Sequence, residues 1–363
     1  MTARPPADAE GDIALAQRRA AGVITLKRPS ACDPLRRPGR AAIADALSRW
    51  ARDPEIYGAI VRAEGAAAFD GGGGERELAA WGRTDQARAR AWLADAYALL
   101  WRMECFAKPT ISLIDGEAAG LLGALSLYGT HRAAGQAYRF AVPEVGFGSF
   151  PGHGLTWLLA RLPPGIGMYL ALTGRGLGRA DAYRLGLVTH CVAGDRFAAI
   201  CGAISDAEPV DILLDACHED PGAGELDAIA PAIARCFTAD TPEDIIARLH
   251  AERRQGQWAE AVTADLLRAS PTSLKIAHRQ LRAAAARDLR AALVADFGIA
   301  SRILEGWDFY AGVRPLPEHR ARPPWRPPRL EEVRAEDVEA VFAALGGDQL
   351  RLATRAEMQA FKA

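Results

Sequence analysis

The spacing of the hydrophobic residues changes near residue 155. Before that point, short apolar runs rich in β-branched residues predict strands. These strands are expected at residues 13–27 (two strands around a glycine-containing turn), 57–65, 109–116 and 137–144. Apolar residues at helical spacing predict a helix over 40–53, and an alanine- and leucine-rich stretch predicts a buried helix over 117–129. The alternation of strands and helices predicts an α/β domain with crossover connections.

Beyond residue 155 the pattern is helical. Two of the predicted helices begin with a hydroxyl N-cap followed by proline, at Thr241 and Ser270. Helices are expected at 154–162, 165–174, 179–187, 241–252 and 270–285, with a last short one at 334–345. The acidic stretch 206–226 is expected to be a loop, and the proline-rich stretch 314–330 is expected to wrap over a surface.

These patterns divide the chain of 363 residues into four parts. Residues 1–12 carry no apolar core of a signal peptide and are expected to be a disordered lead. The remaining parts are an α/β core at 13–205, a helical region at 206–330 and a C-terminal extension at 331–363.

The composition argues against several classes of function. The formal net charge of −1 argues against a nucleic-acid partner, which usually requires a basic face. No apolar run is long enough to cross a membrane. The six cysteines form no CxxC pair and no zinc-type spacing, so we expect reduced thiols in a cytoplasmic protein and no metal site.

Two glycine clusters, at 71–74 and at 116–123, each follow a predicted strand. Neither matches a dinucleotide-binding motif or a phosphate-binding loop. Taken singly, the first cluster is equally well explained as a flexible surface loop and the second as close helix packing. Together they would place two backbone N–H groups at strand ends, where such groups can bind the oxyanion of an acyl intermediate.

Glu144 is the candidate acid or base. Its neighbours Val142, Val145, Phe147 and Phe150 are apolar, and desolvation among them would raise the pKa of the carboxyl group toward neutral pH. The alternative is that Glu144 only caps the turn that follows it.

Several segments resemble the crotonase (enoyl-CoA hydratase/isomerase) superfamily, and most closely its 3-hydroxyisobutyryl-CoA hydrolase branch. The resemblance extends over about residues 13–330 and includes GVITLKRPSACDPL, AAAFDGGGGER, KPTISLIDGEAAGLLGALSL and FAVPEVGFGSFPGHG. The segments SPTSLKIAHRQL, GWDFYAGVRP and PPWRP separate the hydrolase branch from ordinary hydratases. The resemblance implies a spiral of ββα units with a helical C-terminal region.

The resemblance also implies roles for individual residues. The amides of Gly73 and Leu121 would bind the thioester oxygen, and Glu144 would act as nucleophile or as base for water. Residues near coenzyme A would be Arg28, Ala31, Gly72, Arg76 and Gly120, although Arg76 is equally well explained as a solvated loop arginine. No cofactor would be bound permanently, because coenzyme A is part of the acyl-CoA substrate. A homo-oligomer is also implied, with a subunit number that varies within this branch.

The chain departs from the family pattern at four positions. Gly74 replaces an aspartate that steadies the oxyanion loop, and Leu121 replaces a glycine, so that its side chain would crowd the thioester. Ala124 stands where hydratases carry their first catalytic glutamate, and the hydrolase branch lacks that glutamate too. Gly152 replaces the branch's second carboxylate. The adjacent His153, with an ordinary pKa near 6.5, would take over that role unless it is a surface residue.

These departures leave three hypotheses. The first is an acyl-CoA hydrolase that resembles 3-hydroxyisobutyryl-CoA hydrolase and uses Glu144; a substrate that lacks the 3-hydroxyl group is left open as an alternative. The second is an isomerase or hydratase-type enzyme with Glu144 as a single proton shuttle. The third is a non-catalytic CoA-binding protein that kept the fold.

Overall fold

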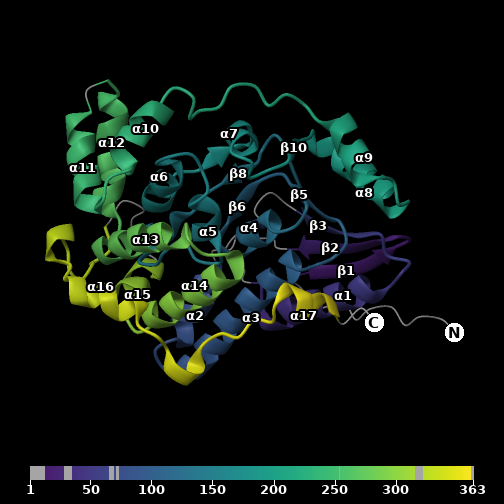
Figure 1. Ribbon diagram of the computed structural model, residues 1–363, viewed down its shortest axis with the longest axis horizontal. Coiled ribbons are helices and arrows are strands. Elements are labelled where there is room, and N and C mark those ends of the chain that lie inside the picture. Colours follow the sequence, from purple (N-terminus) through teal and green to yellow (C-terminus); the bar gives the residue numbers. More distant parts are fainter. Residues whose placement is uncertain are drawn as a thin grey trace.

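The computed structural model describes residues 13–27, 35–64, 69–70, 73–252, 254–314 and 322–360. The expected disordered lead at 1–12 lies outside them. Within these ranges the chain forms two sheets surrounded by helices; the helices between residues 230 and 342 gather on the left of Figure 1, whereas those at 197–217 and 355–360 lie to the right. The expected α/β fold with a helical C-terminal region is confirmed.

The larger sheet has six strands. Their order is β1 (Ile13–Arg18), β2 (Ala21–Lys27), β3 (Gly58–Glu64), β5 (Thr110–Ile114), β7 (His131–Ala134) and β10 (His190–Cys191). β1 and β2 are antiparallel, and the other neighbours are parallel. The predicted turn between β1 and β2 contains no glycine: it is Arg19–Ala20. Gly22 lies inside β2, where a Cβ atom would come within 2.3 Å of the Trp50 ring.

The smaller sheet has four short strands. Their order is β4 (Phe69–Asp70), β6 (Glu117–Ala119), β8 (Arg139–Phe140) and β9 (Leu177–Gly178). The first three are parallel, and β9 is antiparallel to β8. The helix expected over 117–129 is therefore a strand followed by a helix. The first three residues of that range favour helix by composition, but β6 pairs with both β4 and β8, and this pairing overrides the local preference.

Helices of the first half cover the two sheets. They are α1 (Arg37–Arg52), α2 (Gly73–Trp81), α3 (Gln86–Glu104), α4 (Gly120–Leu127), α5 (Leu155–Leu159), α6 (Ile166–Thr173) and α7 (Arg179–Arg184), with the 3₁₀ turns η1 (Pro143–Phe147) and η2 (Gly194–Arg196). Neither α2 nor α3 has a counterpart among the predicted elements.

The second half is helical. Its elements are α8 (Phe197–Ser205), α9 (Val210–Cys217), α10 (Ala230–Phe237), α11 (Pro242–Ala251), α12 (Gly256–Arg268), α13 (Pro271–Ala284), α14 (Leu289–Ile303), α15 (Asp308–Val313), α16 (Ala335–Phe342) and α17 (Arg355–Ala360), with η3 (Leu330–Glu332) and η4 (Gly346–Asp348). Both predicted N-caps are confirmed: the side chains of Thr241 and Ser270 accept hydrogen bonds from the N–H groups of Asp244 and Ser273.

Two expectations for this half are wrong. The acidic stretch 206–226 contains α9, which buries Val210 and Leu214 despite the surrounding charges. The helix at 334–345 is not the last, because α17 follows it. The segment before α17 returns to the first half (Figure 1), where Trp101 donates a hydrogen bond to the carbonyl of Ala353 and Arg355 pairs with Glu104.

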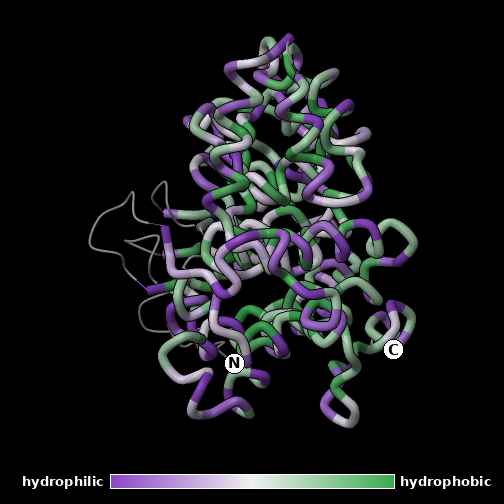
Figure 2. The backbone as a smooth tube through the Cα atoms, turned by 90° about the vertical axis from the view of Figure 1, so that its left-hand side faces the viewer, coloured by the Kyte–Doolittle hydropathy of each residue, from purple (hydrophilic) through white to green (hydrophobic). Residues whose placement is uncertain are grey.

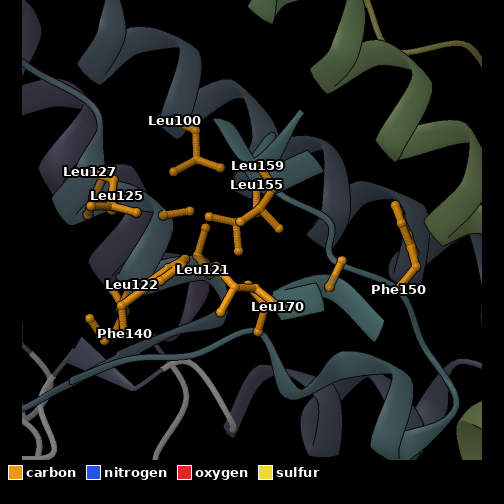
Figure 3. Close-up of a cluster of buried hydrophobic side chains, with 14 of the residues drawn as sticks. Leu100, Leu121, Leu122, Leu125, Leu127, Phe140, Phe150, Leu155, Leu159 and Leu170 are labelled. Atoms are coloured by element: carbon orange, nitrogen blue, oxygen red, sulfur yellow. The ribbon is translucent and has the colours of Figure 1, made fainter. Parts of the chain in front are cut away.

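The main core lies between α4 and its neighbours. Leu121, Leu122 and Leu125 of α4 pack against side chains of α5, α6 and β8 (Figure 3). In Figure 2 hydrophobic and hydrophilic segments alternate at short intervals along the tube. Among the described residues, no helix has both the length and the apolar character of a membrane span.

Candidate functional site

The parallel strands β4, β6 and β8 end at the same edge of the smaller sheet. Their register pairs Asp70 with Ala119 and Ala118 with Phe140. The amide of Ala141 continues this ladder with a 3.1 Å hydrogen bond to the carbonyl of Ala118. The chain segments that follow the three strands therefore start side by side, and each carries a residue that the sequence singles out.

Helices begin directly after two of these strands. α2 starts at Gly73, three residues beyond the end of β4, and α4 starts at Gly120, with Leu121 as its second residue. The N–H groups in the first turn of a helix have no partner within the helix. Gly73 and Leu121 thus present backbone donors at one edge of the sheet, where the helix dipoles also favour negative charge.

Glycines in the second segment allow the close approach of α4 to the sheet. Gly120 has φ +54°, which glycine adopts without strain. A Cβ atom on Gly123 would lie 2.8 Å from the backbone of Ala118 in β6. The side chain of Leu121 is buried in the core beside Leu122 and Leu170 (Figure 3). The side chain is thus part of the hydrophobic core, and its crowding of a thioester stays a prediction.

Glu144 follows the third strand. It lies in the first turn of η1 with 3% of its surface exposed, and Val142 and Val145 beside it are fully buried. Its backbone carbonyl accepts a 2.9 Å hydrogen bond from the amide of Ser149, so the backbone closes the turn. The carboxyl side chain is thus held in an apolar interior.

The helical second half fixes the turn that carries Glu144. The carbonyl of Val145 accepts a 3.1 Å hydrogen bond from the amide of Ser270, the N-cap of α13. Gly148, with φ +79°, lies so close to Asp308 of α15 that a Cβ atom would come within 2.3 Å of its carbonyl oxygen. Ser270 and Asp308 are themselves joined by a 2.6 Å side-chain hydrogen bond.

The loop that follows η1 is held by a buried carboxyl group of α14. Asp296 is fully buried and accepts hydrogen bonds from the amide of Gly154 (2.8 Å), the hydroxyl of Thr156 (3.2 Å) and the side-chain amide of Gln280 (2.6 Å). Burial raises the pKa of Asp296 to about 7, although these three donors act in the opposite direction. Asp296 thereby fixes the position of His153, which precedes Gly154.

His153 is buried and is not a surface residue. Its ring stacks on Tyr97 of α3 at a centroid distance of 5.3 Å, and its backbone bonds to the hydroxyls of Tyr97 and Tyr128. Burial and the nearby charge of Arg40 lower the pKa of His153 to about 4. The expectation of an ordinary pKa near 6.5 is therefore wrong: the ring is neutral at pH 7 and is a weak base.

Aromatic side chains of α3 occupy the places left by two missing carboxylates. A Cβ atom on Gly74 would lie 2.9 Å from the ring of Trp92. A Cβ atom on Gly152 would lie 3.0 Å from the hydroxyl oxygen of Tyr97. The side chain of Ala124 is fully buried inside α4 and supplies no polar group.

The predicted coenzyme A contacts are only partly described. Arg28, Ala31 and Gly72 lie outside the described residues. Arg76 is in the exposed part of α2, and Gly120 is at the start of α4. In the part of the chain that the structure describes, no group of three or more His, Cys, Asp and Glu side chains could hold a metal ion.

Comparison with known proteins identifies the family of the chain. Residues 21–342 match the family model described as enoyl-CoA hydratase/isomerase, and the chain belongs to this family. Within it, the chain is 32% identical over 354 residues to "3-hydroxyisobutyryl-CoA hydrolase, mitochondrial" of Xenopus tropicalis, an alignment that covers 94% of this chain and 91% of the relative.

Solved structures share the fold over nearly the whole chain. A carnitinyl-CoA dehydratase from Mycobacterium thermoresistibile has a TM-score of 0.86 and 30% identity, with 94% of this chain and 98% of that chain covered. An enoyl-CoA hydratase from Rhodobacter sphaeroides 2.4.1 has a TM-score of 0.86 and 31% identity, with 94% and 100% covered. The crotonase-type fold is thus confirmed.

Three residues of the site were missed in the sequence: Arg40 of α1, Tyr97 of α3 and Asp296 of α14. Helical spacing could have located α3, since Ala89, Trp92, Ala96 and Met103 recur on its buried face. No comparable signal brings Asp296 to Gly154, because the two residues are 142 positions apart in the sequence.

Proposed function

We propose that the protein is an acyl-CoA thioester hydrolase of the 3-hydroxyisobutyryl-CoA hydrolase type. The observation that supports this proposal is the common edge of β4, β6 and β8, because Gly73, Leu121 and Glu144 each follow one of these strands within a few residues. The name of the relative from Xenopus tropicalis, matched over 94% of this chain, supports the same activity.

In the proposed reaction the thioester oxygen accepts hydrogen bonds from the amides of Gly73 and Leu121. Each donor of this kind contributes on the order of 10²- to 10³-fold in rate. Glu144 either attacks the carbonyl carbon or removes a proton from the water that does so. With Glu144 as base, the water oxygen bonds to the carbonyl carbon, the carbon–sulfur bond breaks, and the proton that Glu144 took from water passes to the sulfur of the leaving coenzyme A. With Glu144 as nucleophile, a glutamyl–acyl anhydride forms as the carbon–sulfur bond breaks, the thiolate takes up a proton from solvent, and water then hydrolyses the anhydride to release the acid and restore Glu144.

The two solved structures with the same fold are named as a dehydratase and a hydratase. Water addition to a double bond is expected to use two carboxylates, one of them at position 124. This chain has Ala124 there, fully buried. Hydrolysis with Glu144 and two amides needs no group at that position, so we favour hydrolysis.

Isomerisation is the second candidate, because it needs only one base. The burial of Glu144 with no described carboxylate at position 124 or 152 favours it over hydration. An isomerase would exchange the proton at the acyl α-carbon with solvent and would release no free thiol. Coenzyme A enters in either case as part of the substrate, with Arg76 as a candidate phosphate contact. A homo-oligomer and a cytoplasmic location stay predictions.

Thiol release from a panel of short acyl-CoAs, including 3-hydroxyisobutyryl-CoA, tests the proposal. We expect free thiol with the wild type and its loss with Glu144→Gln. Glu117→Gln is the matched control, because Glu117 lies in the same sheet at the exposed start of β6. Absence of thiol release from every substrate by the wild type would refute the hydrolase. Proton exchange at the α-carbon would then identify an isomerase.

A further inference from the structure

Arg40 is a buried cation in the first half of the molecule. It lies on the inner face of α1 with 1% of its surface exposed. Its Nη1 atom donates a 2.6 Å hydrogen bond to the carbonyl of Leu35. Within the described residues, its Nε and Nη2 atoms have no hydrogen-bond partner. A buried guanidinium with two unused donors is costly unless a ligand satisfies them.

The nearest acidic side chains do not satisfy these donors. Glu77 and Asp95 are close enough to affect Arg40 electrostatically. However, Glu77 accepts a 2.9 Å hydrogen bond from the indole of Trp92, and Asp95 accepts a 2.7 Å hydrogen bond from Arg37. Burial is the larger effect and lowers the pKa of Arg40 to about 10, so the side chain is still charged at neutral pH.

One contact and one electrostatic effect connect Arg40 to the candidate active site. Its guanidinium lies 4.3 Å from the ring centroid of Trp92. The outer edge of the same ring contacts Gly74, the residue after Gly73. The charge of Arg40 also acts on His153. Arg40 therefore lies near the start of α2, and its charge reaches the loop that follows Glu144.

His153 is a second buried polar group whose ring nitrogens can still form hydrogen bonds. Neither ring nitrogen has a hydrogen-bond partner among the described residues, and only 9% of the residue is exposed. The neighbouring Gly152 carries no side chain that could pair with Arg40. A region with a buried cation, a neutral imidazole and no described carboxylate bonded to either is suited to an anion.

We propose that Arg40 and His153 bind a carboxylate on the acyl group, so that the preferred substrate is a CoA thioester of a dicarboxylic acid. The proposal rests on the hydrolase function above and specifies its substrate class. A guanidinium can offer two parallel N–H donors to one carboxylate, and the neutral imidazole can donate a third. The substrate charge would also compensate the buried charge of Arg40.

Three ligands of matched shape test this proposal: isobutyryl-CoA, 3-hydroxyisobutyryl-CoA and methylmalonyl-CoA. They differ only in a methyl, hydroxymethyl or carboxylate group. Calorimetric binding to Glu144→Gln protein avoids turnover. We expect methylmalonyl-CoA to bind about 10- to 100-fold more tightly than isobutyryl-CoA, as for hydrogen bonds to a charged group. Equal binding of these two, or no measurable binding of any of the three, overturns the proposal.

Substitutions of arginine identify the residue responsible. In the Glu144→Gln background, Arg40→Met should remove the preference for methylmalonyl-CoA, and Arg40→Lys should remove most of it because lysine lacks the planar pair of donors. Arg37→Met is the matched control: Arg37 lies on the same helix with 71% of its side chain exposed, and the preference should persist. A preference that survives both Arg40 substitutions, or that Arg37→Met also removes, refutes the role of Arg40.

A stability measurement separates binding from structure. Without ligand, Arg40→Met should resist urea at least as well as the wild type, because it removes an uncompensated buried charge. A clearly lower urea midpoint would show that Arg40 serves the fold and would contradict the proposal. Failure of thiol release with an intact, Arg40-dependent preference would refute only the hydrolase. Hydrolysis of 3-hydroxyisobutyryl-CoA without any preference would refute only the carboxylate site.

Discussion

Asp296 allows a quantitative test of how the His153 loop is held. Burial raises the pKa of this carboxyl group from 3.8 to about 7, despite three hydrogen bonds to its oxygens. The folded state therefore binds more protons than the unfolded state between those two values. The contribution of Asp296 to stability is fully present below pH 3.8 and is lost as the pH rises toward 7.

The shift sets the size of the effect. One pKa unit corresponds to about 1.4 kcal/mol, so a shift of roughly three units corresponds to about 4 kcal/mol. Such an effect is large, since domains are commonly stable by about 5–15 kcal/mol. Asp296→Asn keeps the shape of the side chain in a neutral form and removes the titration.

Urea unfolding, followed by tryptophan fluorescence, measures this contribution. One unfolding curve is recorded at about each pH unit between roughly pH 4.5 and 8. The free energy of unfolding of the wild type minus that of Asp296→Asn should fall by about 1.4 kcal/mol per pH unit up to pH 7 and then level off. Asp288→Asn is the control, since it removes an exposed carboxylate at the start of the same helix. A difference that is independent of pH would show that the hydrogen bonds balance desolvation, and one that rises with pH would show that they outweigh it; either result contradicts the reasoning.

Three further substitutions test the packing of the site by the same urea assay. Gly154→Ala should cost at least about 1–2 kcal/mol, because Gly154 has φ +75° and the new Cβ would meet the Tyr128 hydroxyl; an unchanged midpoint would contradict this. The free energy of unfolding of the wild type should fall by about 3 kcal/mol more than that of His153→Asn between pH 6.5 and pH 4. The reason is that the folded pKa of His153 lies at about 4, so that the unfolded state binds more protons in that range. The same pH profile for both proteins would refute this. Leu121→Ala should cost about 2–5 kcal/mol because its side chain is buried in the core, and a loss below 1 kcal/mol, far under this range, would place it elsewhere.

Local signals explain which elements were predictable. The caps Thr241 and Ser270 and the β-branched residues of β2 act within a few positions of their own element, so the helices and the strand were correctly predicted. β6 was not separated from α4, because its three residues Glu117–Ala119 are stabilised by neighbouring strands and have no local strand signal.

The same distinction applies to the site. Glu144 is recognisable from its apolar neighbours and from the resemblance of the segment around it. The contacts that position it come from Ser270 and Asp308, more than a hundred residues away. The stacking of Tyr97 on His153 and the placement of Arg40 depend in the same way on how α1 and α3 pack, which no spacing along the chain reveals.

The central claim is that the ends of β4, β6 and β8 hold one thioester between two backbone amides and Glu144. The most direct test is the infrared carbonyl frequency of a CoA thioester, labelled with carbon-13 at its carbonyl, bound to Glu144→Gln protein. The account predicts a shift to lower frequency relative to the thioester in water, because two amides polarise the carbonyl. A bound thioester whose carbonyl frequency matches that in water would contradict it.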